Sequence, residues 1–335
     1  MSLRVHRAGP VVALQDQGRF GYLDKGLSRS GAADQLALHE GAALLGQNPA
    51  LAALEMAGFG GEFEAGCDMV IALTGAPMAA SIDGAAVPWN ATLALVAGQR
   101  LSIGAARAGV YGYLHVAGGF EGPEFLGSRS AQISSGIGAL VQPGDTLRVG
   151  TGSAEPGRCL QVSDRFSGGP LRVVESFQTT MFSGETRARF ANTAFRRGPR
   201  ANRMGVELDS DGPGFAAEGQ LNVLSEVITP GDIQMTGAGN PFILLPECQT
   251  TGGYPRIASV LPGDMPRAVQ AAAGAVLKFD FLSIDAARAA HLAYVADLAR
   301  LRQQVTALVR NPHDIPDLLS YQLISGAVSA LSNEE

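Results

Sequence analysis

Residues 71–84 read IALTGAPMAASIDG and show the pattern that dominates this chain. The apolar run 69–74 ends at a Gly-Ala-Pro turn, and turn residues at the ends of short apolar runs indicate strands. Comparable runs bounded by Gly, Pro, Asn or Asp lie at 92–96, 99–103, 111–116, 146–149, 171–175, 233–236, 241–245, 257–261 and 275–281. This spacing predicts a mainly β protein built from antiparallel barrels or sandwiches.

The two halves of the chain carry similar stretches in the same order. In the first half these are 26–39 (GLSRSGAADQLALH), 71–84 and 96–104; in the second they are 197–208 (RGPRANRMGVEL), 224–242 and 271–279. We infer two similar β domains joined near the turn-forming segment TGSAEPGR. The predicted units are residues 1–160, 161–283 and a C-terminal helix with its tail at 284–335.

Helical patterns occur in two places. Ser30 is expected to cap a helix over about 33–45, which Gly46 ends. A second, amphipathic helix is predicted from a stripe at steps of three and four, formed by Ile284, Ala287, His291, Tyr294, Leu298, Leu301, Val305 and Leu308 and ended by Asn311-Pro312. We expect the stripe to pack on the protein's own barrel, with docking of a partner as the alternative, and His291 to be a core or boundary residue.

Composition narrows the functional class. The 335 residues are enough for about two domains, and a net charge of −6 with 17% charged residues excludes a disordered chain and gives no basic surface for nucleic acid. Three separated cysteines indicate neither a disulfide framework nor a zinc site, and five scattered histidines indicate no metal cluster. Without a signal peptide or a long apolar segment, the chain is expected to be cytoplasmic, with no membrane association.

The segment ECQTTGGYP at 247–255 is the strongest candidate for chemistry. It combines a carboxylate, an amide and two hydroxyls with two glycines and an aromatic residue: Glu247, Gln249, Thr250, Thr251, Gly252, Gly253 and Tyr254. Glycines let backbone N–H groups approach a substrate oxygen, as an oxyanion site requires. The alternative is a simple corner of the barrel.

Other polar clusters are weaker candidates. Asp16 and Arg19 stand three apart in a turn, where they can bond each other or face a cleft. Arg129 lies in the loop GSRS, which suits an anionic ligand. Asn202-Arg203, followed by Met204-Gly205, is a second polar cluster beside a glycine and is a candidate of the same kind. The chain lacks a P-loop, a dinucleotide fingerprint, the HExxH and GxSxG motifs, and the Ala-Met-Lys-Met sequence that carries covalent biotin.

Seven of these motifs resemble, in order, those of the allophanate hydrolase subunit 2 family, also called KipA or PxpC, which groups with biotin-dependent carboxyltransferases. The motifs are LQDQGRFGYLDKGLSRSGAAD at 14–34, GQNP at 46–49 followed by Leu54-Glu55, LTGA at 73–76, YLHVAGG at 113–119, GSRS at 127–130, NRMG at 202–205 and QTTGGYP at 249–255. The resemblance covers roughly residues 3–282.

The resemblance implies two cyclophilin-like β-barrel domains in a pseudo-symmetric pair. It also implies a partner of the allophanate hydrolase subunit 1 type (KipI or PxpB), and in some cases a PxpA-like third subunit. Family members act in ATP-dependent 5-oxoprolinase, which opens 5-oxoproline to glutamate, or in the carboxyltransferase part of urea carboxylase. Others, KipA-like, are noncatalytic regulators that bind and antagonise a KipI-like partner.

The chain departs from the family pattern at three places. Ala201-Asn202 replace a usual Ser-Asp, Glu247-Cys248 replace Asp-Arg, and TGAG at 236–239 replaces a Pro-Pro-Asp-Gly turn. Losing an arginine and a carboxylate is expected either to change the anionic ligand or to abolish one activity.

From these motifs we expect a subunit of a 5-oxoprolinase or of a related urea amidolyase-type complex, inactive alone, that binds a small amide, lactam or urea. ATP or carboxybiotin would come with the partner subunits. Gly252 and Gly253 are the expected backbone donors, Thr250 and Thr251 the hydroxyl donors, and Arg129 and Arg203 the anion clamps. Candidate acids, bases or ligand acceptors are Asp16, Asp34, Glu55 and Glu247, for each of which an internal ion pair is the alternative. Arg19, Asn202, Gln249 and Tyr254 complete the predicted substrate-binding set.

Overall fold

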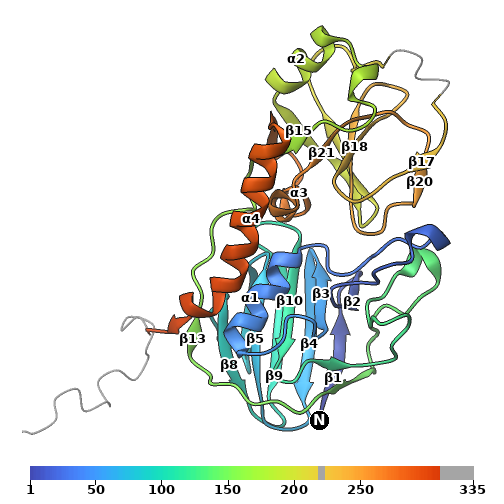
Figure 1. Ribbon diagram of the computed structural model, residues 1–335. Helices are drawn as coiled ribbons and strands as arrows, with labels where there is room; N and C mark the ends of the chain where they lie inside the picture. Colours follow the sequence, from blue (N-terminus) through green and yellow to red (C-terminus); the bar gives the residue numbers. More distant parts are fainter. Residues whose placement is uncertain (218–222, 310–335) are drawn as a thin grey trace, which may run out of the picture.

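Strands dominate the computed structural model, which describes residues 1–217 and 223–309 (Figure 1). The described strands of the first half, together with one strand from the C-terminal segment, form two seven-stranded sheets. One has the order β11 (Phe120–Glu121), β12 (Thr146–Val149), β1 (Ser2–Ala8), β4 (Phe59–Ala65), β9 (Arg100–Ala106), β6 (Met78–Ile82), β7 (Ala85–Ala86). The other has the order β2 (Val12–Gln15), β3 (Ala53–Ala57), β10 (Tyr111–Val116), β5 (Met69–Gly75), β8 (Ala91–Leu95), β13 (Arg158–Cys159), β23 (Thr306–Ala307).

The two sheets face each other across one apolar core. Alternate residues point inward, as Leu3 and Phe63 do from the first sheet and Leu54 and Leu114 from the second. Strands β5 and β10 are buried on both faces because α1 (Gln35–Leu45) covers the outer face of their sheet. A glycine at position 41 makes this close approach possible, since a Cβ there would lie 2.4 Å from the ring of His115.

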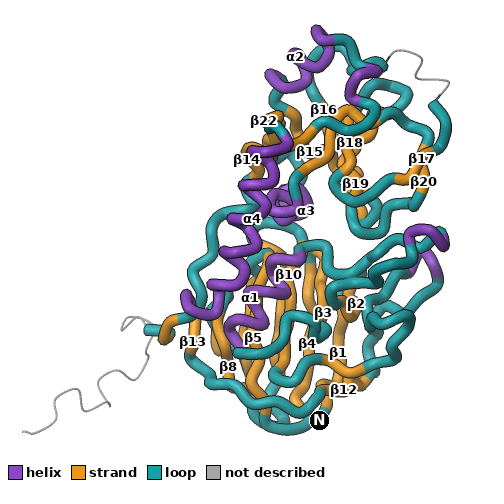
Figure 2. The backbone as a smooth tube through the Cα atoms, viewed as in Figure 1, coloured by secondary structure: helices purple, strands orange, loops and turns teal. Residues whose placement is uncertain are grey.

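The second half is a closed barrel. Its strands are, in order, β14 (Gly168–Val174), β21 (Arg256–Val260), β18 (Asp232–Met235), β19 (Pro241–Leu244), β16 (Gly205–Asp209), β15 (Phe195–Asn202) and β22 (Val276–Phe281). β14 and β22 run parallel, whereas the other neighbours are antiparallel. A separate ribbon of β17 (Glu226–Val227) and β20 (Thr251–Gly252) lies beside the barrel (Figure 2).

Helices cover the ends and seams of these sheets. They are α1, α2 (Gly184–Asn192), α3 (Met265–Gln270) and α4 (Ile284–Arg300), with 3-10 turns η1 (Leu23–Lys25), η2 (Ile133–Ser135), η3 (Thr179–Met181), η5 (Pro262–Asp264) and η6 (Leu301–Gln304). α2 closes one end of the barrel by placing Phe190 among Phe195, Phe215 and Phe279, at ring-centroid distances of 4.8–5.5 Å. None of the described helices is long and apolar enough to span a membrane.

The mainly β fold is confirmed, and the barrel predicted for the second half is closed. In the first half the described strands form two facing sheets. The unit boundaries at 160 and 283 stay predictions. The C-terminal segment joins the first half, because β23 pairs with β13.

Both predicted helices need correction at their ends. Asp34, not Ser30, caps α1, since its carboxylate accepts a hydrogen bond from the Ala37 N–H at 3.2 Å, while Ser30 has a φ of 53° inside the preceding loop. α4 stops at Arg300, so Leu301, Val305 and Leu308 lie beyond the helix; Asn311 and Pro312 lie outside the described residues.

The apolar stripe packs on the protein in part. Tyr294 and Leu298 are half-buried and α4 contacts β14 and η5 of the barrel half, whereas Leu301 and Val305 pack against an apolar cluster of the first half.

Within α4 itself only Ala287 is buried. Ile284 is 69% exposed and His291 is also exposed, so His291 is not a core residue. Figure 1 shows α4 running along one side of the molecule, from the barrel to the first half.

Candidate functional site

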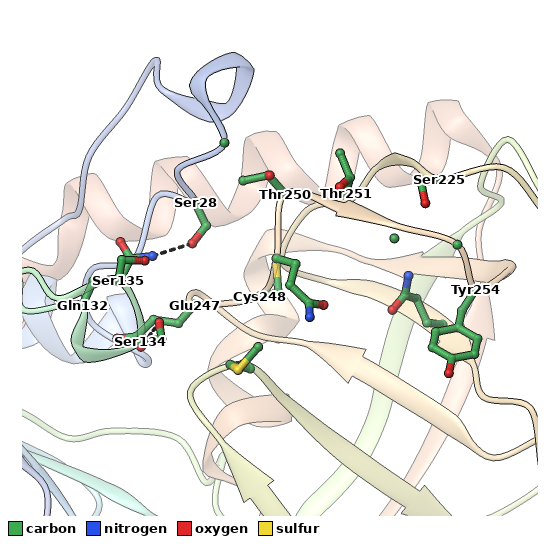
Figure 3. A pocket seen from close by; sticks show the side chains of 16 residues that line it. Ser28, Gln132, Ser134, Ser135, Ser225, Glu247, Cys248, Thr250, Thr251 and Tyr254 are labelled. Atoms are coloured by element: carbon green, nitrogen blue, oxygen red, sulfur yellow. Dashed lines mark hydrogen bonds between the residues drawn. The ribbon is translucent and has the colours of Figure 1, made fainter.

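A cavity of about 570 Å³ lies where the loops of the first half meet the β17–β20 ribbon of the second (Figure 3). The first half contributes Gly26, Ser28, Gln132, Ser134 and Ser135. The second half contributes Met204, Ser225, Gln234, Glu247, Cys248, Gln249, Thr250, Thr251, Gly252, Gly253 and Tyr254. All seven residues of the 247–254 segment that the sequence singled out therefore line this cavity.

The lining is polar but almost uncharged. Hydroxyl and amide side chains prevail, and among the described residues Glu247 is the one charged side chain on the wall. Such a surface offers hydrogen bonds without a countercharge, so it suits a small neutral polar group better than an anion.

Glu247 is held at the base of the cavity by Arg203. Its Oε1 accepts a hydrogen bond from Arg203 Nε at 2.6 Å, whereas Oε2 has a longer contact of 3.5 Å with the Ser134 hydroxyl. Arg203 also donates to Glu55 and to the Gly31 carbonyl, so its three nitrogens are all used within the protein.

This buried ion triad joins the two halves. Burial disfavours the charged form of Arg203, but Glu55 and Glu247 together outweigh burial, so the pKa of Arg203 lies above its usual value. Glu55 accepts two further hydrogen bonds, from the Tyr113 hydroxyl at 2.6 Å and the Ala33 N–H at 2.8 Å. Arg203 and Glu55 do not line the cavity. Both are engaged in an internal ion pair, which was the alternative to a direct role in ligand binding.

A second buried ion cluster fixes the same interface. The carboxylate of Asp34 accepts hydrogen bonds from Arg165 Nε and from the Gln270 amide, both at 2.8 Å. Arg165 also binds Glu40 with two parallel hydrogen bonds of 2.7 Å. The sequence analysis missed Arg165, Glu40 and Gln270, because nothing local marks residues whose partners lie 125 or more positions away.

Asp16 organises the loop at 127–130 and does not reach the cavity. It accepts hydrogen bonds from the hydroxyls of Ser128 and Ser130, at 2.6 and 2.5 Å, and from the backbone N–H of Arg129 at 2.6 Å. Arg19 donates to the carbonyls of Phe125 and Ser130 rather than to Asp16. These contacts lock two loops together.

Two further predicted binding residues also stand outside the cavity. The Arg129 guanidinium pairs with Glu124 at 3.2 Å on the surface. The Asn202 side chain accepts from the backbone N–H of Met204 at 2.8 Å and so closes a turn.

Gly252 provides space in the cavity wall. Neither Gly252 nor Gly253 has a positive φ, so the backbone conformation does not require glycine at either position. A Cβ at position 252, however, would lie only 2.6 Å from Gln234 Nε2 and 3.0 Å from Ile228 Cδ1. At position 253 the nearest atoms would be 3.5 Å away, an ordinary contact.

Gln132 and Gln234 are cavity residues that the sequence analysis missed. Gln132 Nε2 donates to the Ser28 hydroxyl at 3.0 Å (Figure 3), but its Oε1 is buried and has no partner among the described residues. Gln234 Nε2 is likewise buried and unpartnered within the described chain. A glutamine inside the fully buried strand β18 was the available signal, because an uncompensated buried amide is costly.

Cys248 contributes a neutral thiol to the wall. Burial, and secondarily the charge of Asp232, raise the pKa of Cys248 to about 12. At neutral pH the sulfur is therefore protonated and is a poor nucleophile. Among the described residues, no group of three or more His, Cys, Asp or Glu side chains could hold a metal ion.

Comparison with known proteins agrees with this architecture. The family model "carboxyltransferase domain, subdomain A and B" matches residues 25–281. The C subunit of Escherichia coli 5-oxoprolinase is 33% identical over 291 residues, covering 85% of this chain and 93% of that protein. The urea amidolyase of Saccharomyces cerevisiae is 25% identical, covering 86% of this chain but 17% of that protein.

Solved structures share the fold. The crystal structure of TTHA0988 superposes with a TM-score of 0.75 at 32% identity, covering 83% of this chain, which spans 55% of that one. The K. lactis urea amidolyase superposes with a TM-score of 0.80 at 23% identity and covers 93% of this chain, which spans 21% of that one. The resemblance drawn from the seven motifs is confirmed, and the chain belongs to the carboxyltransferase domain family with subdomains A and B.

Proposed function

We propose that this chain is the subunit of a 5-oxoprolinase-type complex that holds the lactam of 5-oxoproline in the cavity between its halves. The observation that carries the proposal is the nearly uncharged, hydrogen-bonding lining of that cavity. It is supported by the relative named as the C subunit of 5-oxoprolinase, 93% of which this chain covers.

The cavity offers the groups that opening an amide requires. Negative charge develops on the carbonyl oxygen, and donors fixed in a water-poor site stabilise it, each commonly by about 3–4 kcal/mol. Thr250 and Thr251 supply hydroxyls, and Gly252 and Gly253 expose backbone near them. Glu247, with Oε2 turned toward Ser134, is placed to accept a proton.

The nucleotide belongs on a partner chain in this proposal. A triphosphate needs cations or a cradle of N–H groups, whereas the described cavity wall has no Lys, Arg or His. Cys248 lines the cavity where the family motif has an arginine. For the same reason, the carboxylate of 5-oxoproline would face the open side of the cavity and meet its countercharge on a partner.

The partners we propose are a subunit 1-type chain (KipI or PxpB-like) and a PxpA-like third subunit, acting together in the cytoplasm. This chain spans about half of TTHA0988 and smaller shares of the urea amidolyases, so these relatives carry additional sequence beyond the region they share with it. That additional sequence supports a function shared with other chains.

The test is turnover of 5-oxoproline with ATP by the complex reconstituted from co-purified subunits. Thr251→Val, which removes a cavity hydroxyl, should lower turnover while the melting temperature stays within a few degrees. Thr146→Val, on an exposed position of β12, is the matched control and should leave turnover unchanged. Absence of turnover with 5-oxoproline, and with urea plus carboxybiotin, would contradict the enzyme proposal and favour a noncatalytic KipA-like regulator.

A further inference from the structure

One wall of the cavity is carried by the short β17–β20 ribbon, which lies beside the barrel (Figure 2). In this ribbon Glu226 pairs with Gly252, and Val227 pairs with Thr251. Thr251 and Gly252 line the cavity. A two-stranded ribbon of this kind is at best marginally stable in water by itself, so its contacts with the barrel decide where Thr251 stands.

Two anchors join the ribbon to the barrel. The first is apolar, because Ile228, directly after β17, packs with Leu244 and Cys248. The second is polar and centres on Arg256, which follows Pro255 at the end of the 247–255 segment. Apolar packing is not directional, whereas hydrogen bonds from a planar guanidinium are, so the second anchor sets the orientation of the ribbon.

The guanidinium of Arg256 binds the ribbon and the barrel at the same time. Its Nη1 donates to the Val227 carbonyl at 2.9 Å and to Asp232 Oδ2 on β18 at 3.2 Å. Its Nη2 donates to Glu226 Oε2 at 2.7 Å, and the same oxygen accepts from the Gln178 amide at 2.9 Å. Its Nε donates to Gln178 Oε1 at 3.3 Å. All three nitrogens are therefore engaged within the chain, which leaves Arg256 unsuited to clamp an anionic ligand.

The core of this polar anchor is buried. The side chains of Arg256 and Asp232 are 8% and 5% exposed, whereas that of Glu226 is 50% exposed. Arg256 is not among the described residues that line the cavity, and its connection with the wall runs through Val227. Withdrawing an ion pair from water offsets most of its attraction, so the effect of the anchor lies in geometry more than in stability.

We propose that Arg256 is a positioning residue of the cavity: it holds Thr251 and Gly252 in place on the wall and does not touch the ligand. Its effect on a reaction rests on the function proposed above, in which Thr251 donates to an oxygen that becomes negative. Such donors act only where they meet the developing charge, and a displacement of about 1 Å can lower a rate about 100-fold.

The first test variant is Arg256→Lys in the full-length chain. Lysine retains a positive charge for the buried Asp232, so the melting temperature should stay within a few degrees of wild type. A single ammonium group cannot bridge Val227 and Glu226 as the planar fork does, so the ribbon should loosen. Glu226→Ala is the second variant, because it cuts the anchor at its exposed carboxylate and leaves the buried Arg256–Asp232 pair intact.

The matched control is Arg172→Lys, the same substitution in the same barrel. Arg172 on β14 binds Asp264 with hydrogen bonds of 2.8 and 2.7 Å, and this ion pair does not include the ribbon. The control therefore also loses a guanidinium fork, but at a place that leaves β17 and β20 as they are.

The assay is hydrogen–deuterium exchange followed by mass spectrometry, in which peptides from the ribbon are compared with peptides from β18. Both test variants should speed exchange in the ribbon about tenfold, because each loses a charge-assisted hydrogen bond between ribbon and barrel. Exchange in β18, and in the ribbon of the control, should match wild type. An equal acceleration in β18 would show a merely structural role and overturn the proposal.

Turnover supplies the second measurement. In the reconstituted complex, Arg256→Lys should lower kcat for 5-oxoproline about tenfold and change KM less than about threefold, since the displaced donor acts in the transition state. Arg172→Lys should leave both unchanged.

Ribbon exchange within about twofold of wild type in both test variants overturns the proposal, as does a loosened ribbon with an unchanged kcat. The function proposed above fails separately. A wild-type complex without any turnover contradicts that function, whereas the exchange measurement still decides whether Arg256 positions the ribbon.

Discussion

Replacing Arg203 by methionine tests whether the two halves are held together by the buried ion triad. Methionine keeps the length of the side chain and removes its charge. The side chains of Arg203, Glu55 and Glu247 are only 12%, 3% and 7% exposed, so the substitution leaves two buried carboxylates without their cation. Breaking a buried ion pair by removing one partner costs about 3–5 kcal/mol.

The control is Arg196→Met on strand β15, just upstream of Arg203. Arg196 pairs with Asp211 at 3.1 Å, but the two side chains are 55% and 88% exposed. Exposed pairs of this kind contribute about 0–1 kcal/mol, so the control should unfold close to the wild type. Both variants remove one arginine charge. The difference between their free energies of unfolding therefore reports the effect of burying the ion pair.

The assay is the free energy of unfolding from urea titration, followed by far-ultraviolet circular dichroism. Arg203→Met should lose about 3–5 kcal/mol, and adding Glu55→Gln should recover at least about 1 kcal/mol, because one uncompensated carboxylate is removed. A loss below about 1 kcal/mol for Arg203→Met would refute the view that the triad stabilises the junction. Arg203→Lys should lie between, since one ammonium cannot reproduce the planar fork of a guanidinium.

The cavity and its surroundings give three further predictions. Gly252→Ala should lower the melting temperature by a few degrees, because its Cβ would lie 2.6 Å from Gln234 Nε2 and 3.0 Å from Ile228 Cδ1, and an unchanged melting temperature would contradict this geometry. At pH 8, iodoacetamide should modify half-buried Cys67 well before Cys248, whose pKa is raised to about 12; mass spectrometry after timed quenching would expose the opposite order. Burial lowers the pKa of His115 to about 3, so below about pH 6.5 only the unfolded state takes up this proton and stability falls. Between pH 7 and pH 4.5 the free energy of unfolding, measured by urea titration, should therefore fall by about 2–3 kcal/mol less in His115→Asn than in the wild type. An identical pH dependence of the two proteins would count against this explanation.

Local patterns located many of the strands. The predicted runs at 69–74, 111–116 and 241–245 correspond to β5, β10 and β19 within a residue at either end. β4 escaped notice because its sequence, FGGEFEA, has the composition of a loop, and it is a strand because Phe63 and neighbouring positions face the core. The C-terminal helix was predicted too long, because the chain after Arg300 turns to pair β23 with β13.

Part of the candidate site was also visible in local sequence, and part depends on contacts between distant segments. The 247–254 segment was identified from the sequence, since adjacent hydroxyl, amide and glycine residues after an apolar strand are a local signal. For Asp34, Glu55 and Arg203 the sequence predicted a role in ligand binding or catalysis, and the structure places all three in buried ion networks. Their partners come from the other half of the chain, with Glu55 and Arg203 separated by 148 positions.

The sequence by itself determined the mainly β class, the family and the segment that forms one wall of the cavity. These features depend on short-range patterns of apolar, turn and polar residues, which act wherever the chain is placed. Tertiary structure alone decided which polar residues are compensated and which are left unpaired. Burial turns an ordinary glutamine such as Gln132 or Gln234 into an unmatched acceptor or donor, because an amide that loses its water must find its partner in the fold or in a ligand.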